Sequence, residues 1–499
     1  MPHQTERPVN VLFITLDQFR GDCLSSAGHP VVRTPNIDRL AAEGVRLAQH
    51  YSQAAPCGPG RAALYTGTYQ MNNRVVANGT PLDHRFDNVA LVARRAGYRP
   101  ALFGYTDQSL DPRDATGIDD PRLSDYEGVL PGFDHVLDLT GQHRPWLEWL
   151  RGLGHDVGDR AEPALSTEPA RPAEHSVSAF LTGRAMEWID EQRATSDAPW
   201  FAHLSYLRPH PPYAAAGRWS TAYDPAEVGL PVPAAAERHP FHDIVLQTEE
   251  CLAPRDEDEL RRLRAQYFGM VSEVDDQLGR LWDFLRDRGE WERTLIVVTA
   301  DHAEMLGEHG LKQKVGYWGS SYHIVGIVRD PRLPAGFGTV VDDFTENVDL
   351  LPTICAAIGQ PVPMQCDGMP LTPFLRGERP PRWRTAAHWE YDWRDVVLRR
   401  GVGPWPDDRR PERYQLTVLR TAGAAYVQFG DGSWRCFDLA ADPTWTAQVR
   451  DPSVVLELAQ QMLVWRARHT DRTFSDWLNE DRGIGRLPAT VQIGSAGSN

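Results

Sequence analysis

The stretch NVLFITLD, residues 10–17, is a run of apolar and β-branched residues that ends in an acid. The stretch TLIVVTAD, residues 294–301, repeats this pattern near the middle of the chain. Short, continuous apolar runs are typical of strands that are buried on both faces, as in parallel sheets. We therefore predict two buried parallel strands, each followed by an aspartate, Asp17 in the first case and Asp301 in the second.

Other segments extend this pattern into an alternation of strands and helices. Residues 98–105 and 199–207 have the composition of further apolar strands. Residues 34–46 have helix start and stop signals, and in residues 257–286 apolar side chains recur every three or four positions. This alternation predicts an α/β fold, in which a mostly parallel sheet is flanked by helices on both faces.

The character of the sequence changes after residue 375. Short segments suited to antiparallel strands are followed by a helical pattern at 452–469 and a Gly- and Ser-rich end at 485–499. We expect a catalytic α/β domain over residues 1–375 and a smaller α+β domain over residues 376–499, with a terminal helix and a flexible tail.

Composition limits the class of protein. The chain has 499 residues and a formal net charge of −16, which argues against a nucleic-acid or anionic-membrane partner. Its polar first residues resemble no signal peptide, and no apolar run reaches membrane-spanning length. Its six cysteines form no CxxC pair, so disulfide and zinc frameworks are not expected. We therefore expect a cytoplasmic protein with no membrane partner.

Four side chains are expected together at one edge of the sheet. In parallel sheets, ligands bind outside the carboxyl ends of the strands, where Asp17 with Gln18 and Asp301 with His302 should meet. Either aspartate alone could instead cap a helix. Two carboxylates, an amide oxygen and an imidazole together favour a divalent-metal site.

The segment CGPGR, residues 57–61, is a candidate reactive loop. Cys57 has only small residues and prolines as close neighbours, which is unusual for a core cysteine. A loop that wraps a phosphate needs five residues between Cys and Arg, whereas three separate Cys57 from Arg61. His210, in RPHPPY, either transfers a proton or merely caps a turn. Lys314 is one of only two lysines among 52 basic residues, and a compact ammonium is not interchangeable with a guanidinium.

The signature CGPGRAALYTG, residues 57–67, resembles that of the type I sulfatases of the alkaline phosphatase superfamily. The motifs LDQFRGD, TPNIDRLAAEGV, ADHAEMLGEHG and ENVDLLPTICAAIG extend this resemblance over most of the expected catalytic domain. The resemblance implies that a formylglycine-generating enzyme oxidises Cys57 to formylglycine (3-oxoalanine). Its hydrated aldehyde would then attack the ester and form a covalent gem-diol ester intermediate.

The resemblance also implies a role for each candidate residue. Arg61 would hold the diol, Lys314 would neutralise charge on the transferred group, and His210 would protonate the leaving oxygen. The implied ligands of one divalent ion are Asp17, Gln18, the group derived from Cys57, Asp301 and His302. The imidazole favours Mn²⁺, Zn²⁺ or Fe²⁺ over Ca²⁺, and the resemblance implies Mn²⁺.

Several stretches resemble the bacterial phosphonate monoester hydrolases, which are also phosphodiesterases. They are MNNRVVANGTPLD at 71–83, YLRPHPPY at 206–213, HWEYDWRDV at 388–396 and WRARHTDRTFSDW at 465–477. Typical arylsulfatases have Lys and His where this chain has Tyr105 and Asp107, so Asn78 and Tyr105 would offer neutral hydrogen bonds to the substrate. Asp107 departs from both patterns: its carboxylate would either repel an anionic substrate or act as the base that deprotonates the diol, and we predict the base role.

The expected function is hydrolysis of phosphonate monoesters and phosphodiesters, with sulfate esters also accepted; the alternative is an aryl- or alkylsulfatase. The substrate would be a small anionic ester. Two segments rich in Pro, Ala, Gly and charge, residues 135–175 and 214–258, are expected to form the mouth of the site. The family resemblance further implies a homo-oligomer, a tetramer, built with the C-terminal domain.

Overall fold

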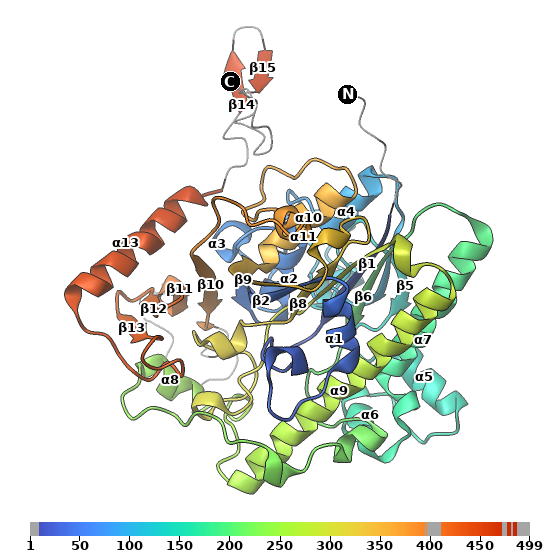
Figure 1. The fold of residues 1–499 in the computed structure, drawn as a ribbon, viewed down its shortest axis with the longest axis horizontal. Helices are drawn as coiled ribbons and strands as arrows, with labels where there is room; N and C mark the ends of the chain where they lie inside the picture. The colour runs from blue at the N-terminus through green and yellow to red at the C-terminus, as the bar shows by residue number, and fades with distance from the viewer. Residues whose placement is uncertain (1–8, 395, 397–410, 472–476, 481–482, 487–499) are drawn as a thin grey trace.

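The fold was analysed in a computed structural model that describes residues 9–394, 396, 411–471, 477–480 and 483–486 (Figure 1). Within these residues, the largest sheet has eight strands in the order β5-β4-β6-β1-β7-β8-β2-β9. The strands are β1 (Asn10–Leu16), β2 (Val45–Tyr51), β4 (Pro100–Gly104), β5 (Asp134–Asp138), β6 (Phe201–Tyr206), β7 (Thr294–Thr299), β8 (Gly326–Arg329) and β9 (Thr339–Glu346). Strand β8 is antiparallel to both of its neighbours, and the other adjacent pairs are parallel.

Strand β1 lies in the middle of this sheet, between β6 and β7. Thr15 of β1 is in register with Ser205 of β6 and with Thr299 of β7. Because the three strands are parallel and in register, the residues that follow β1 and β7 emerge at one edge of the sheet. This arrangement confirms that Asp17 and Asp301 lie at a common edge.

Helices cover both faces of the sheet (Figure 1). Alternate residues of β1 point into two separate cores: Leu12 and Ile14 into one, and Val11 and Phe13 into the other. The first core is completed by α1 (Pro35–Ala42), α5 (Arg144–Gly152), α6 (Ala161–Ser166), α7 (Val177–Thr195) and α9 (Glu257–Asp287). The second is completed by α2 (Cys57–Thr66), α4 (Val89–Arg95), α10 (Leu350–Ala357) and α11 (Thr372–Leu375). The predicted α/β fold is therefore confirmed.

A smaller sheet of five strands has the order β13-β12-β11-β10-β3 within the described residues. Its strands are β3 (Ala54–Ala55), β10 (Ala386–Asp392), β11 (Gln415–Thr421), β12 (Ala424–Phe429) and β13 (Trp434–Asp438). Helix α13 (Pro452–Arg468) packs on it through Leu458 and Met462. Strand β3 pairs in parallel with β10, so the segment directly before Cys57 is an edge of the C-terminal sheet.

Some elements differ from the sequence prediction. The helix expected over residues 34–46 ends at Ala42, and β2 begins at Val45. The expected mouth segment 135–175 contains α5 and α6, whereas 214–258 contains α8 (Pro240–Val245) and short 3₁₀ turns. Strands β14 (Trp477–Glu480) and β15 (Gly483–Arg486) form a hairpin, so the first two residues of the tail predicted over 485–499 belong to a strand, and the rest of it lies outside the described residues. Helix α3 (Gln70–Asn73) is a single turn after α2.

No helix in the described part of the chain is long and apolar enough to span a membrane.

Candidate active site

Four buried side chains meet at the carboxyl edge of β1 and β7. Asp17 follows β1, Asp301 and His302 follow β7, and Cys57 is the first residue of α2. One ligand atom from each of these residues lies within 4.8 Å of those of the others. The structure therefore brings together four of the five predicted metal ligands around one point.

Helix α2 can approach this edge because Gly60 has no side chain. A Cβ atom at residue 60 would lie 2.5 Å from the carbonyl oxygen of Asp301 and 3.0 Å from that of Ala54. Real Cβ atoms essentially never approach backbone atoms so closely. The second glycine of CGPGR thus allows the helix to present Cys57 beside Asp301.

Arg61 lies beneath the cluster and is fully buried. Its Nη2 donates to Asp17 Oδ2 at 3.1 Å and its Nε donates to Asp301 Oδ2 at 3.0 Å. Its Nε also lies 3.1 Å from Asp107 Oδ2, and its Nη1 donates to Ser205 Oγ at 2.7 Å. One guanidinium is thus shared by three carboxylates, and it orients the cluster from below.

Asp17 and Asp301, the two aspartates of the predicted metal site, have different electrostatic environments. Burial and the neighbouring charge of Asp301 raise the pKa of Asp17. Burial alone would raise the pKa of Asp301 too, but His302, Arg61 and Lys314 lower it to about 2. Burial lowers the pKa of His302, so its imidazole is neutral and can act as a ligand.

The donor set fits a divalent cation. Asp17 Oδ1 is buried and has no hydrogen-bond partner among the described residues. His302 Nδ1 donates to the Ala303 carbonyl at 3.1 Å, which leaves the lone pair of Nε2 facing the cluster, 3.2 Å from Cys57 Sγ. An unsatisfied carboxylate oxygen and a lone pair directed at the same point are what a bound metal ion would satisfy.

Gln18 has other partners here. Its Oε1 accepts from Lys314 Nζ at 2.8 Å, its Nε2 donates to Glu304, and its backbone N–H donates to Asp301 Oδ1 at 3.2 Å. Its φ angle is +70°, an uncommon value for a residue other than glycine. Its role as a ligand stays a prediction.

Lys314 and His210 form a pair above the cluster. Lys314 Nζ lies 2.9 Å from His210 Nε2, and His210 Nδ1 lies 2.7 Å from the Pro211 carbonyl oxygen. Burial and the charge of Lys314 lower the pKa of His210 well below its ordinary value. The imidazole is therefore neutral, with Nδ1 donating to Pro211 and Nε2 accepting from Lys314. Burial alone would lower the pKa of Lys314, but the nearby groups of Cys57 and Asp17 raise it, and the net shift is upward.

The three residues predicted to face the substrate also lie here. The Tyr105 hydroxyl donates to Asp17 Oδ2 at 3.0 Å, and its ring lies 4.6 Å from the Arg61 guanidinium carbon. Asn78 Oδ1 accepts from the Gly58 N–H at 2.8 Å. Asp107 is buried, and desolvation raises its pKa well above the ordinary value although Arg61 acts in the opposite direction.

Comparison with known proteins identifies the family. The family model described as "Sulfatase" matches residues 9–360. The chain belongs to the sulfatase family. It is 34% identical to the multifunctional alkaline phosphatase superfamily protein PehA of Trinickia caryophylli, over 95% of this chain and 98% of that protein.

Two solved structures of sulfatase-family relatives are similar over almost their whole length. The phosphonate monoester hydrolase of Agrobacterium radiobacter is 38% identical, with a TM-score of 0.87, covering 97% of this chain and 100% of that one. The phosphonate monoester hydrolase of Silicibacter pomeroyi is 35% identical, with a TM-score of 0.84, covering 96% and 99%. The protein is thus a sulfatase-family hydrolase of the alkaline phosphatase superfamily that resembles phosphonate monoester hydrolases.

Asp17 and Cys57 of this cluster line a cavity of about 560 Å³. Besides predicted residues, its lining includes seven residues that the sequence analysis did not name as site residues: Pro56, Tyr126, Glu127, His143, Leu207, Glu250 and Gln313. His143 and Glu250 fall within the two segments expected to form the mouth. Tyr126 and Glu127 precede these segments and carry no local motif, so only the fold could show that they line the site.

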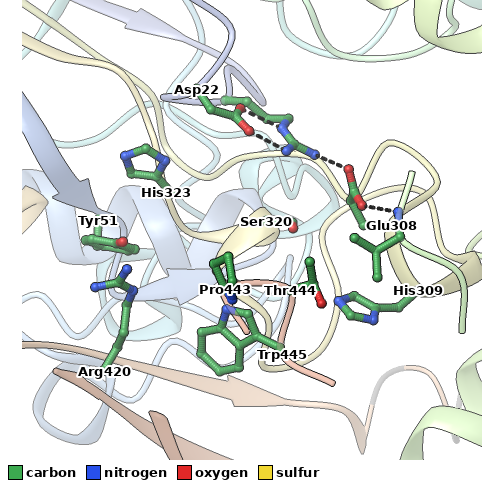
Figure 2. A pocket seen from close by; sticks show the side chains of 13 residues that line it. Asp22, Tyr51, Glu308, His309, Ser320, His323, Arg420, Pro443, Thr444 and Trp445 are labelled. Atoms are coloured by element: carbon green, nitrogen blue, oxygen red, sulfur yellow. Dashed lines mark hydrogen bonds and ion pairs between the residues drawn. The ribbon is translucent and has the colours of Figure 1, made fainter. Parts of the chain in front are cut away.

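A second cavity, of about 260 Å³, lies beside the smaller sheet and holds none of the predicted catalytic groups (Figure 2). The Nε of Arg20 donates a hydrogen bond of 2.8 Å to Asp22, and its Nη1 lies 3.7 Å from Glu308. The Arg420 guanidinium carbon lies 5.4 Å from the centre of the Tyr51 ring. The predicted catalytic residues Cys57, Asp107, His210 and Lys314 line the larger cavity instead.

Proposed function

We propose that this hydrolase cleaves phosphonate monoesters and phosphodiesters, and sulfate esters as secondary substrates. The observation that carries the proposal is the presence of Tyr105 and Asp107 in the cavity, beside Cys57, where typical arylsulfatases would have two cations. Fewer cations weaken binding of a sulfate transition state, which resembles a dianion. The named activity of the two solved relatives supports the same choice.

Two groups would supply chemistry that the unmodified side chains lack. A formylglycine made from Cys57 by a formylglycine-generating enzyme would supply, once hydrated, the hydroxyl nucleophile. A divalent ion would supply Lewis-acid stabilisation, and Asp17, Asp301, His302 and residue 57 are placed to hold it, with Gln18 as a further ligand. We propose Mn²⁺, with Zn²⁺, Fe²⁺ or Ca²⁺ as alternatives, and a cytoplasmic homotetramer.

The chain's own residues would orient and neutralise the reacting groups. Arg61 fixes Asp17, Asp107 and Asp301 relative to one another. Lys314 holds a positive charge beside Gln18 and His210. A bound anionic ester favours protonated His210, and the imidazole would then deliver a proton to the leaving oxygen.

The test is a comparison of matched aryl esters. We would co-express the chain with a formylglycine-generating enzyme and measure kcat/KM with Mn²⁺ on a phosphonate monoester, a phosphodiester, a sulfate and a phosphate monoester. We expect the first two to dominate, the Cys57→Ala variant to be inactive, and the mass of the peptide containing residue 57 to show formylglycine. A higher kcat/KM on the sulfate would instead identify a sulfatase.

A further inference from the structure

Glu304 is a fully buried acid that has no role in the proposed function. Its Oε1 accepts from the backbone N–H of Leu306 at 2.8 Å and from that of Gln313 at 2.7 Å. Its Oε2 accepts from Gln18 Nε2. Because Gln313 directly precedes Lys314 in the chain, this one carboxylate joins Gln18 to the loop that ends at Lys314.

The three residues that donate to Glu304 all have an uncommon backbone conformation. Their φ angles are +70° at Gln18, +52° at Leu306 and +70° at Gln313. Residues with a side chain adopt such angles at an energetic cost, which the surrounding contacts must offset, and they concentrate at functional sites. Glu304 therefore holds together three strained positions beside the predicted metal site.

The amide of Gln18 has one allowed orientation between its two neighbours. Its Oε1 accepts from Lys314 Nζ at 2.8 Å, and an ammonium group can only donate. Its Nε2 must therefore face Glu304, where both carboxylate oxygens accept N–H groups. The charge of Glu304 also acts on Tyr213: burial and this charge raise the pKa of Tyr213, so its hydroxyl keeps its proton. The groups that these contacts bring to Glu304 are thus donors.

A glutamine at residue 304 would satisfy only part of this arrangement. Its oxygen could still accept both backbone N–H groups, but its NH₂ group would face the NH₂ group of Gln18. The requirement for glutamate rather than glutamine therefore comes from Gln18, and not from the loop backbone.

We propose that Glu304 is a positioning residue for the reaction: it holds the amide oxygen of Gln18 toward Lys314 and fixes the loop that leads to Lys314. The inference rests on the proposed function, in which Gln18 is a further metal ligand and Lys314 neutralises charge on the transferred group. With its amide reversed, Gln18 would present an NH₂ group, which is no ligand for a divalent ion and would face the Lys314 ammonium donor against donor. Loss of one contact would thus disturb two groups of the site.

The test exchanges the two side chains. Glu304→Gln retains the size of the residue and an acceptor for both backbone N–H groups, so a purely structural acceptor would tolerate it. Positioning predicts instead that kcat/KM with Mn²⁺ on the phosphonate monoester falls by at least about tenfold, as for residues that orient a metal ligand. The double variant Gln18→Glu/Glu304→Gln again places a donor opposite an acceptor, and it should regain most of the loss.

Glu308→Gln is the matched control. Glu308 is a buried acid in the same loop, and its Oε2 accepts from the Val232 N–H at 2.7 Å. Among the described residues it hydrogen-bonds to neither Gln18 nor Lys314. This variant should therefore retain kcat/KM, and an equal loss in Glu304→Gln and Glu308→Gln would overturn the inference.

Unfolding separates this inference from the proposed function. Urea titrations with a chelator would compare the wild type, Gln18→Glu, Glu304→Gln and the double variant, and they need neither metal nor turnover. We expect the double variant to unfold at a higher urea concentration than either single variant, because each single variant places two like groups face to face. That order supports the positioning of Gln18 even if no ester is cleaved, an outcome that would overturn only the proposed function. A double variant no more stable than the single variants, or Glu304→Gln as active as the wild type, overturns the inference.

Discussion

Single residues determine the geometry around Cys57. Arg61 is buried and contacts three carboxylates, and each contact restricts the position of an acidic group that would otherwise repel its neighbours. One guanidinium can do this because its five donors form a rigid planar fork. The arginine of CGPGR therefore orients the acidic residues of the site, besides its predicted role of holding the diol.

Replacement of Asp107 tests its predicted role as a base. Because desolvation raises the pKa of Asp107, the carboxyl should lose its proton, and activity should rise, only as the pH rises through that raised value. Asp107→Thr should lower kcat at least tenfold and remove this acidic limb from the pH–rate profile. Turnover equal to that of the wild type at every pH would contradict the base role.

Replacement of Gly60 tests the close approach of α2. In Gly60→Ala the added methyl group would clash with two backbone carbonyls that cannot rotate away, so we expect a loss of about 1–3 kcal/mol in the free energy of unfolding. Urea unfolding would measure it, and Mn²⁺ binding should weaken at the same time. Gly183→Ala in α7 is the control, because no atom lies within 4 Å of the added methyl group. An unfolding free energy unchanged in Gly60→Ala would refute the steric explanation.

At the scale of elements, a buried ion pair holds the loop that contains His210. The loop after β6 contains His210, and the buried side chain of Arg208 hydrogen-bonds to the backbone of this loop. Arg208 is fully buried, and its Nη1 donates to the carbonyls of His210 and Pro212 at 2.8 Å each. Its Nε donates at 3.1 Å to the buried carboxylate of Glu168. Arg208 is therefore a positioning residue for His210.

A double-mutant cycle tests this role of Arg208. Arg208→Lys retains the charge but loses the planar set of donors, so kcat should fall about tenfold with little change in KM. In a His210→Gln background, Arg208→Lys should lower kcat no further, because the residue it positions is already absent. Fully additive losses in kcat would indicate a general structural role instead.

At the scale of the whole molecule, several neutral histidines are buried in the core. His50 is fully buried between Thr345 and Asn347, and burial lowers its pKa to about 3. Burial lowers the pKa of His203 to about 3 as well. The unfolded chain takes up protons at these histidines near pH 6.5, whereas the folded chain does not until about pH 3. The stability that they contribute is thus present above pH 6.5 and lost progressively below it.

Unfolding at two pH values tests this acid sensitivity. Between pH 7.5 and pH 5, the His50 linkage should lower the free energy of unfolding by about 2 kcal/mol. His50→Gln should be less stable at pH 7.5 but should lose about 2 kcal/mol less over the same interval. Urea titrations with chelator present would measure both chains without metal. An identical loss in the two proteins would show that His50 does not titrate on unfolding.

Much of the fold follows from local sequence patterns. The apolar runs that became β1, β4, β6 and β7 and the periodic helix α9 were all predicted, because burial of a strand or of a helix face leaves a regular mark in the sequence. Strand β2 was not predicted, and the antiparallel direction of β8 could not have been predicted. The pairing of each strand depends on strands that are distant in sequence. The pairing of β3 with β10 is likewise invisible to local patterns.

The candidate site likewise contains residues that could be placed from the sequence and contacts that could not. Asp17, Asp301 and His302 could be predicted together, since strand ends in a parallel sheet converge whatever the intervening chain does, and the family resemblance added Cys57 to them. Only the tertiary structure showed that Arg61 is shared by three acids, that Lys314 contacts His210, and that Glu127 and His143 line the cavity. Local sequence patterns identified the candidate reactive groups, because residue types and strand ends are local properties. Tertiary structure decided which charges share a cavity, because that depends on packing between segments far apart in the chain.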